Sequence, residues 1–283
     1  MIQIGTMQGR LTPSRGRGMH FFPFENWQEE FYQAAEIGLN EIEWIFDRER
    51  MEENPLWTKA GIAELRHITE TTGIEINSVC FNYFMRCPFF SLGKSEKKEG
   101  YQRNLEMTKR ILDAWAEAGG KVLEIPLVDE ASLKTSEEEK EVGEFISNTA
   151  DKADEYGIKI VLETDLPPGQ FNGFLESIEK KYIYATYDSG NSSGLGYDAE
   201  SEICSLKGRI HNVHIKDKVY QGTTVEPGTG NADFDKVFST LKRIGYGNSF
   251  VLEAARGVDG KEQETLGRQA QFIKNYLKKY EFD

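Results

Sequence analysis

The chain has 283 residues and a formal net charge of −13, with 39% hydrophobic and 29% charged residues. This balance is typical of a soluble globular protein and excludes a largely disordered chain. The negative net charge argues against a nucleic-acid partner, because a phosphate backbone would be repelled. No run of about eighteen apolar residues and no signal-peptide pattern occurs, so we expect neither membrane insertion nor export.

The cysteines carry a second piece of information about the compartment. There are three of them, Cys80, Cys87 and Cys204, and none of their spacings is C-x-x-C. An odd number without that spacing indicates neither a disulfide framework nor a zinc site. We therefore expect a cytoplasmic protein.

One pattern recurs along the chain: a segment with helical spacing, then a glycine, then four to eight residues rich in Val, Ile, Leu and aromatics. It predicts a helix, its C-cap and a strand. The pattern occurs around Gly38, Gly73, Gly119 with Gly120, Gly157, Gly208 and Gly245. An opening strand at 2–7 and another at 182–188 bring the expected strands to eight. The expected helices are 26–37, 57–72, 99–119, 135–156, 172–180, 198–207, 233–244 and 264–280.

Strict alternation of strands and helices predicts a parallel sheet, and near-continuous apolar strands suit a sheet that is buried on both faces. We expect a single (β/α)₈ barrel domain over 1–283, with an open, doubly wound sheet as the alternative. The longest irregular stretches are expected at 8–25, 80–98 and 218–232. Each follows a strand, where the loops of a barrel build the active-site face.

Four of the last strands end in a residue that can bind a metal: Glu163, Asp188, His214 and Glu253. Strand ends of a barrel converge on one rim, and three carboxylates with one imidazole suit Mn²⁺, Mg²⁺ or Co²⁺. Each has a structural alternative, since a carboxylate here can cap the next helix and a strand histidine can belong to the core. The conjunction favours a metal site, because four buried ionisable groups need a compensating cation.

Further polar and aromatic residues follow the other strands and are candidates for substrate binding. Residues 228–233, GTGNAD, lie between the last two strands, where barrels often bind phosphate, and cations at 216, 218 and 256 are near in sequence. The structural alternatives are a plain loop, surface cations and aromatic core packing. The substrate-binding candidates are Arg10, Glu43, Trp44, Asn82, Glu124, Asn191, Lys216, Asp217 and Arg256.

These motifs resemble those of the xylose-isomerase-like superfamily of sugar phosphate isomerases and epimerases, which also includes inosose dehydratase and endonuclease IV. The matching segments are LET at Glu163, YDSGN ending at Asn191, HIKD at 214–217, PGTGNADF at 227–234 and VLE at Glu253. Their separations are similar to those of the ketose 3-epimerase branch. The resemblance spans nearly the whole chain and is strongest from Glu163 onward.

The resemblance implies one divalent metal ion, Mn²⁺, Mg²⁺, Co²⁺ or Zn²⁺, held by Glu163, Asp188, His214 and Glu253. It also implies that the two glutamates act as acid and base on a sugar or sugar phosphate, through a cis-enediolate. Asn191 stands where ketose 3-epimerases have a histidine, and Tyr220 stands where they have an arginine, so 3-epimerisation itself stays open. Four histidines are too few for the trinuclear zinc cluster of endonuclease IV.

The sequence therefore predicts a metal-dependent sugar isomerase or epimerase. An inosose-type dehydratase on the same scaffold and a non-catalytic sugar-binding protein are the alternatives. We expect a small-molecule partner and neither nucleic acid nor membrane. The choice between a monomer and a homo-oligomer is left open, as are the sugar, the reacting carbon and the native metal.

Overall fold

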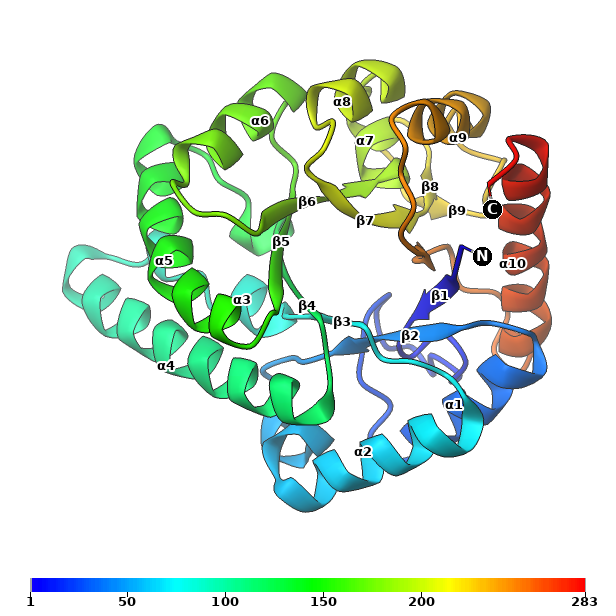
Figure 1. Ribbon diagram of the computed structural model, residues 1–283, viewed down its shortest axis with the longest axis horizontal. Coiled ribbons are helices and arrows are strands. Elements are labelled where there is room, and N and C mark those ends of the chain that lie inside the picture. Colours follow the sequence, from blue (N-terminus) through cyan, green and yellow to red (C-terminus); the bar gives the residue numbers. More distant parts are fainter. Residues whose placement is uncertain (1, 283) are drawn as a thin grey trace. The chain divides into compact units, whose positions relative to one another are not determined.

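The computed structural model describes residues 2–282 and shows eight parallel strands in a closed barrel (Figure 1). The strands follow the order β1-β10-β7-β6-β5-β4-β3-β2 around the barrel. This confirms the (β/α)₈ expectation against the open sheet. The strands are β1 Ile4–Met7, β2 Glu41–Ile45, β3 Ser78–Cys80, β4 Val122–Leu127, β5 Lys159–Thr164, β6 Ile183–Asp188, β7 Ile210–Ile215 and β10 Phe250–Leu252.

The expected helices begin and end close to their predicted positions. The structure differs from the sequence predictions at three other places. The α-helices are α1 Trp27–Glu36, α2 Lys59–Thr72, α3 Asn82–Arg86, α4 Lys94–Ala118, α5 Ser136–Glu155, α6 Pro168–Ser177, α7 Ser189–Leu195, α8 Ala199–Ser205, α9 Phe234–Arg243 and α10 Glu262–Lys279. Helix α7 was not expected. The stretch 80–98 is not irregular, because α3 and the first turn of α4 lie in it. The stretch 218–232 contains part of a hairpin, β8 Asp217–Lys218 with β9 Thr224–Val225.

The chain divides into two compact units. The first comprises Met1–Ile45, Ile68–Ile76 and Ala185–Asp283, and the second comprises Phe46–His67 and Asn77–Tyr184. In the first unit β1 pairs with β2 and β10, and β7 pairs with β10 and β6. In the second unit β4 pairs with β3 and β5. Single-domain organisation stays a prediction.

Apolar side chains of the strands are buried in each unit, which agrees with the continuous apolar runs in the sequence. In the first unit Val213, Val251 and Leu252 are fully buried, and the ring of Phe238 on α9 stacks on Phe250 at 5.1 Å between centroids. In the second unit the indole N–H of Trp115 on α4 donates to the carbonyl of residue 122, which ties the helix to β4. Side chains on both faces of these parallel strands are thus removed from water.

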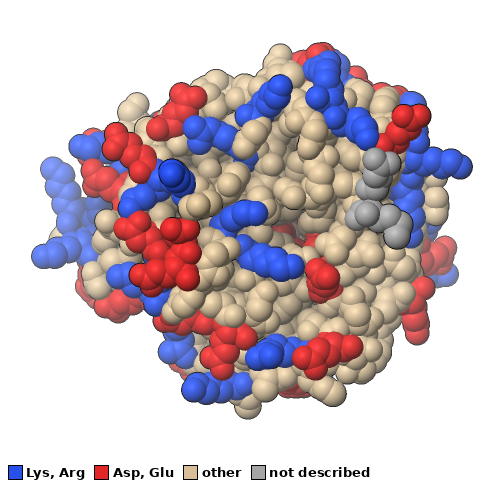
Figure 2. All heavy atoms as spheres, viewed as in Figure 1, with Lys and Arg blue, Asp and Glu red and all other residues tan. Residues whose placement is uncertain are grey.

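The surface carries both signs of charge. Acidic and basic side chains are interspersed over the face shown in Figure 2. Among the described residues, no helix combines the length and the apolar character needed to cross a membrane.

Candidate active site

Strand register in the first unit puts three ionisable side chains on one face of the sheet. Asp188 on β6 pairs with His214 on β7, and His214 pairs on its other side with Val251 on β10. Paired residues point to the same face, and residues two apart along a strand share it. Glu253 comes two positions after Val251 and continues the pairing, since its N–H donates to the carbonyl of residue 215 at 3.1 Å. The ends of three neighbouring strands therefore present Asp188, His214 and Glu253 together.

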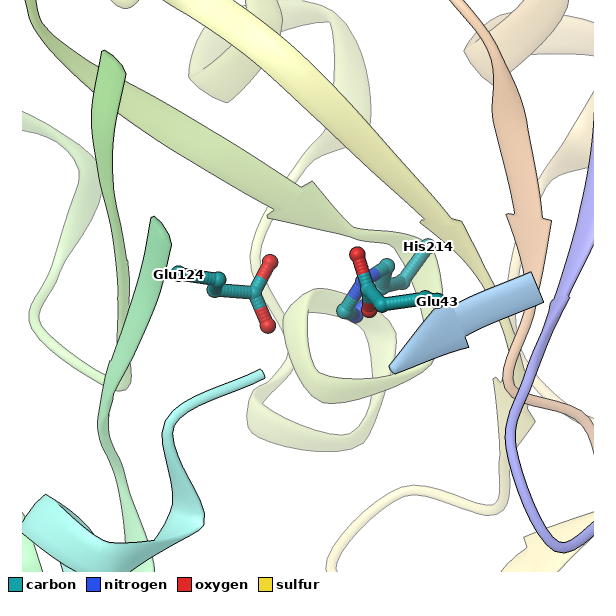
Figure 3. A group of neighbouring side chains, drawn as sticks. All are labelled: Glu43, Glu124 and His214. Carbon is teal, nitrogen blue, oxygen red and sulfur yellow. The ribbon is translucent and has the colours of Figure 1, made fainter. Parts of the chain in front are cut away.

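The ring of His214 lies between two carboxylates. Its Nδ1 is 2.8 Å from Oε2 of Glu253, and its Nε2 is 2.9 Å from Oε1 of Glu43 on β2. Figure 3 shows the Glu43 carboxylate beside the ring. The side chain of Asn212 donates to the second oxygen of Glu43 at 2.9 Å. His214 is fully buried and has polar partners on both ring nitrogens, so it is not an apolar core histidine.

Lys216 supplies a cation to this group of carboxylates. Its Nζ lies 3.3 Å from Oδ2 of Asp188 and also contacts Oε1 of Glu253. The other oxygen of Asp188 accepts from the N–H groups of Gly190 and Asn191, at 2.7 and 2.9 Å, and so caps α7. A Cβ at Gly190 would lie 2.5 Å from Cγ of Lys216, so a glycine there leaves room for the lysine stem. Asp188 is thus both a helix cap and a member of the site.

His20 also reaches this group, although it was not among the residues expected in the site. Its Nε2 lies 2.9 Å from Oε1 of Glu253. The His20 side chain is 23% exposed while that of Glu253 is 3% exposed, so His20 lies on the more open side of the pair. The available sequence signal was weak: a histidine within the long stretch 8–25, which follows β1.

Burial and charge set the protonation of these groups. Burial alone raises the pKa of Glu253, but Lys216, His20 and His214 together hold it well below its usual range. Burial lowers the pKa of His20 and lowers the pKa of Arg10 to about 10. At neutral pH Glu253 is therefore an anion.

The donor set in the first unit fits a divalent metal. Ligand atoms of Asp188 and His214 lie within 4.8 Å of each other, as do those of Glu43 and His214. Carboxylate oxygens with one imidazole suit Mn²⁺, Mg²⁺ or Co²⁺, and also Zn²⁺. The carboxylates of Asp188 and Glu253 already share one cation, the ammonium of Lys216. These residues form a carboxylate and histidine cluster that could bind a metal.

The second unit contains three of the expected site residues. Glu124, on β4 and labelled in Figure 3, is fully buried, and Glu163 at the end of β5 is 5% exposed. Glu163 pairs with Pro126, which is two positions after Glu124, so both glutamates point to the same face of this sheet. Asn82 is buried on α3, and its Oδ1 accepts from the thiol of Cys80 at 3.2 Å.

Three other candidates from the sequence have mainly structural partners. Trp44 is fully buried and packs against Phe22 and Trp27 at 5.0 and 5.4 Å between centroids. It follows Glu43 directly on β2 and so lies on the other face of the sheet. The guanidinium of Arg256 donates to the carbonyls of residues 12 and 19. Arg10 donates to the carbonyl of residue 19 as well.

Asp217 organises the loop in which a phosphate site was considered. Its carboxylate accepts from the N–H groups of Gly228, Gly230 and Ala232, at 2.9, 2.8 and 3.0 Å. Three amides of the segment 228–232 are therefore already bound to a carboxylate of the chain itself. Lys218 lies 3.5 Å from the side-chain oxygen of Asn191.

Comparison with protein families gives one match that covers most of the chain. The model of the family described as xylose isomerase-like TIM barrel matches residues 31–276.

Individual relatives agree with this match. L-ribulose-5-phosphate 3-epimerase UlaE of Salmonella heidelberg is 25% identical over 244 residues, which are 81% of this chain and 82% of that protein. The structure of L-ribulose 3-epimerase superposes with a TM-score of 0.77 at 16% identity, over 99% of this chain and 96% of that one. The structure of the IolI protein with a bound zinc atom gives 0.73 at 19% identity, over 99% of both chains. The two structural likenesses show the shared fold.

Proposed function

The chain belongs to the xylose isomerase-like TIM barrel family, and from that premise we propose that it is a metal-dependent sugar or sugar-phosphate epimerase or isomerase. In this proposal one divalent ion is held by Glu163, Asp188, His214 and Glu253. The two glutamates act as acid and base, and the reaction passes through a cis-enediolate. The epimerase names of several relatives support the reaction class.

One observation carries the proposal. Asp188 and Glu253 turn carboxylate oxygens toward a single cation, Lys216, and Glu253 also contacts the ring of His214. Buried carboxylates are costly unless a cation compensates them, and such clusters are common at catalytic sites. A set of groups at the ends of neighbouring barrel strands is also where enzymes of this fold place their chemistry.

The chemistry divides between the ion and the chain. When bound, the metal polarises the carbonyl and adjacent hydroxyl of a ketose, which makes the intervening C–H more acidic. Glu253 is the candidate to accept that proton, and Glu163 is the candidate to return it. Lys216 is placed to hold a substrate oxygen, because its ammonium lies among the same groups. Glu43 fixes the orientation of the His214 ring through Nε2.

Metal content is the first test. We expect about one Mn²⁺ or similar ion per purified chain, because the four protein ligands form one metal site and leave further coordination positions open for substrate. His214→Ala should weaken Mn²⁺ binding in a calorimetric titration, while His67→Ala, an exposed change on α2, should leave it unchanged. Absence of any titratable divalent ion would refute the proposal.

The roles of the glutamates are tested with Glu163→Gln and Glu253→Gln. Each change keeps the size and one oxygen but removes the basic carboxylate, so turnover should fall roughly 100-fold or more while part of the metal affinity remains. Solvent deuterium separates the mechanisms. In a two-base epimerase one variant still exchanges the substrate C–H from one epimer without forming product, whereas a one-base isomerase loses exchange and turnover together. Near-native turnover in both variants would show that the two glutamates bind the metal but do not act as acid and base.

Product analysis separates the proposed reaction from its alternatives. The assay uses a panel of ketoses, free and phosphorylated, with Mn²⁺ present. An epimer or aldose as product supports the proposal. An unsaturated or deoxy product would instead indicate a dehydratase, and binding without C–H exchange would indicate a sugar-binding protein.

A further inference from the structure

The loop 8–25 brings one side chain, His20, to the group proposed to move the proton. Nε2 of His20 is 2.9 Å from Oε1 of Glu253. The other carboxylate oxygen, Oε2, lies 2.8 Å from Nδ1 of His214. The two oxygens of Glu253 therefore face different partners: Oε2 faces the ring of His214, a proposed metal ligand, while Oε1 faces His20 and accepts a hydrogen bond from Lys216.

The backbone next to His20 is held by two arginines, which we call the arginine clamp: Arg10 and Arg256. Both donate to the carbonyl of Met19, the residue that precedes His20. Arg256 approaches that carbonyl with Nε at 3.2 Å and with Nη2 at 3.1 Å. Charged donors to a carbonyl form stronger hydrogen bonds than neutral ones. The backbone next to residue 20 is thus held by Arg10 of the same loop and by Arg256 of the segment that follows β10.

The residue after His20, Phe21, contacts two guanidinium groups through its ring. The guanidinium carbons of Arg17 and Arg256 lie 3.7 and 4.4 Å from the ring centroid of Phe21. Gly9 approaches the same residue so closely that a Cβ would lie 2.4 Å from the carbonyl oxygen of Phe21. The residues on either side of His20 are therefore held by contacts with other parts of the chain, which places the backbone of His20 beside Glu253.

We propose that His20 is a positioning residue for Glu253, which fixes the orientation of the carboxylate by holding Oε1. This inference rests on the proposed function, because it takes Glu253 as the group that accepts the proton. A glutamate that binds a metal through one oxygen performs proton transfer with the other only if rotation about its last bond is restricted. The Lys216 ammonium also restricts this rotation, because it contacts the same oxygen, Oε1.

A purely structural role for His20 makes different predictions. If the imidazole only fills space in the loop, an apolar side chain of similar size replaces it without loss. If it holds Oε1 by an N–H group, glutamine at this position retains the function, because the Gln amide nitrogen falls near the place of Nε2. His20→Gln and His20→Leu are therefore a matched pair that differs in the donor.

The contact is tested first without any substrate. The ¹⁵N chemical shifts of the His20 ring are assigned in the full-length metal-free protein by comparison with His20→Gln. Glu253→Gln should move these shifts, because Nε2 then meets a different partner, whereas Glu264→Gln on the surface of α10 should not. Unchanged His20 shifts in Glu253→Gln would overturn the inference even if the protein proves to be an epimerase.

Kinetics test the consequence, using the ketose that the parent protein turns over best with saturating Mn²⁺. His20→Leu should lower kcat roughly 10-fold to 100-fold, while KM and Mn²⁺ affinity change by less than about threefold. His20→Gln should recover most of kcat. Equal kcat values for the parent, Gln and Leu proteins would overturn the positioning role. A parent protein that turns over no ketose contradicts the proposed function, whereas the ring shifts report on the His20 contact independently.

Discussion

Two long loops of the first unit are each folded around one buried carboxylate, and they differ in the origin of that carboxylate. The loop 218–232 is bound by Asp217, which directly precedes it. The loop 8–25 is bound by Glu30, which comes from α1 after the loop and accepts from the N–H groups of Gly9 and Leu11 and from the hydroxyl of Thr12. The first loop is thus organised by its own segment. The second depends on residues from several elements.

The carboxylate of Glu30 has a raised pKa. Burial raises the pKa of Glu30 to about 7 although three donors lower it. The loop 8–25 is also held by the arginine clamp and by two hydrogen bonds at its tip, where Asp259 accepts from the backbone N–H groups of Ser14 and Arg15 at 2.9 and 2.8 Å. The loop that carries His20 is therefore held by several hydrogen bonds that involve charged side chains.

The largest effect is expected at Asp217. Asp217→Ala removes a buried carboxylate and leaves three part-buried backbone N–H groups without their charged acceptor, which should cost about 4 kcal/mol of unfolding free energy. Denaturant unfolding followed by circular dichroism measures it. Asp233→Ala, which removes an exposed N-cap of α9, serves as the control with an expected loss of about 1 kcal/mol. Equal losses would show that Asp217 is no more than an ordinary cap.

A smaller effect is expected at Gly9, with Gly16 as the matched control. Both have a positive φ, +79° and +82°, but a Cβ at Gly9 meets the carbonyl of Phe21 at 2.4 Å while Gly16 has nothing within 4 Å. Gly9→Ala should cost about 3 kcal/mol and Gly16→Ala about 1 kcal/mol. Gly9→Ala should also lower kcat by displacing His20. If the two variants lose the same free energy of unfolding, the close approach of Gly9 to the carbonyl of Phe21 does not contribute to stability.

The pH dependence of stability distinguishes Glu30 from other groups. Its folded pKa of about 7 lies above the ordinary value of 4.5, so its contribution is complete below pH 4.5 and is lost as pH rises through 7. Relative to Glu30→Gln, the parent protein should lose about 2 kcal/mol between pH 5.5 and pH 7.5. Thermal unfolding of both proteins across this range measures the difference. Parallel stability curves would contradict the raised pKa.

The smallest effect is expected at Arg17. Arg17→Met removes the cation over Phe21 and should cost about 1 kcal/mol or less. Arg110→Met is a close match, because Arg110 lies at the same 3.7 Å over Trp57 in the second unit. Similar losses of stability are expected, with kcat lowered only in Arg17→Met, since only that contact supports the loop of His20. A loss of kcat in both variants would point to general destabilisation.

The sequence alone was sufficient for the barrel and for part of the candidate site. Apolar strands that follow a glycine, and helices with a 3.6-residue period, are local signals that each segment carries within itself. Asp188, His214 and Glu253 could be found because a strand end is marked by the change from apolar to polar residues. The helices α3 and α7 were missed since each is short, and a short helix has too few turns to show a period.

Only the tertiary structure decided how the site is completed. The contact between His20 and Glu253 joins residues far apart in sequence, and it depends on arginines at positions 10 and 256 that meet at one carbonyl. The sequence did not show that the oxygens of Asp217 accept from three amides of its own loop; its role in binding substrate stays a prediction. Periodicity and spacing describe the neighbours of a residue along the chain. Which partner a loop side chain meets is determined by how the loop closes, and closure is the sum of many distant contacts.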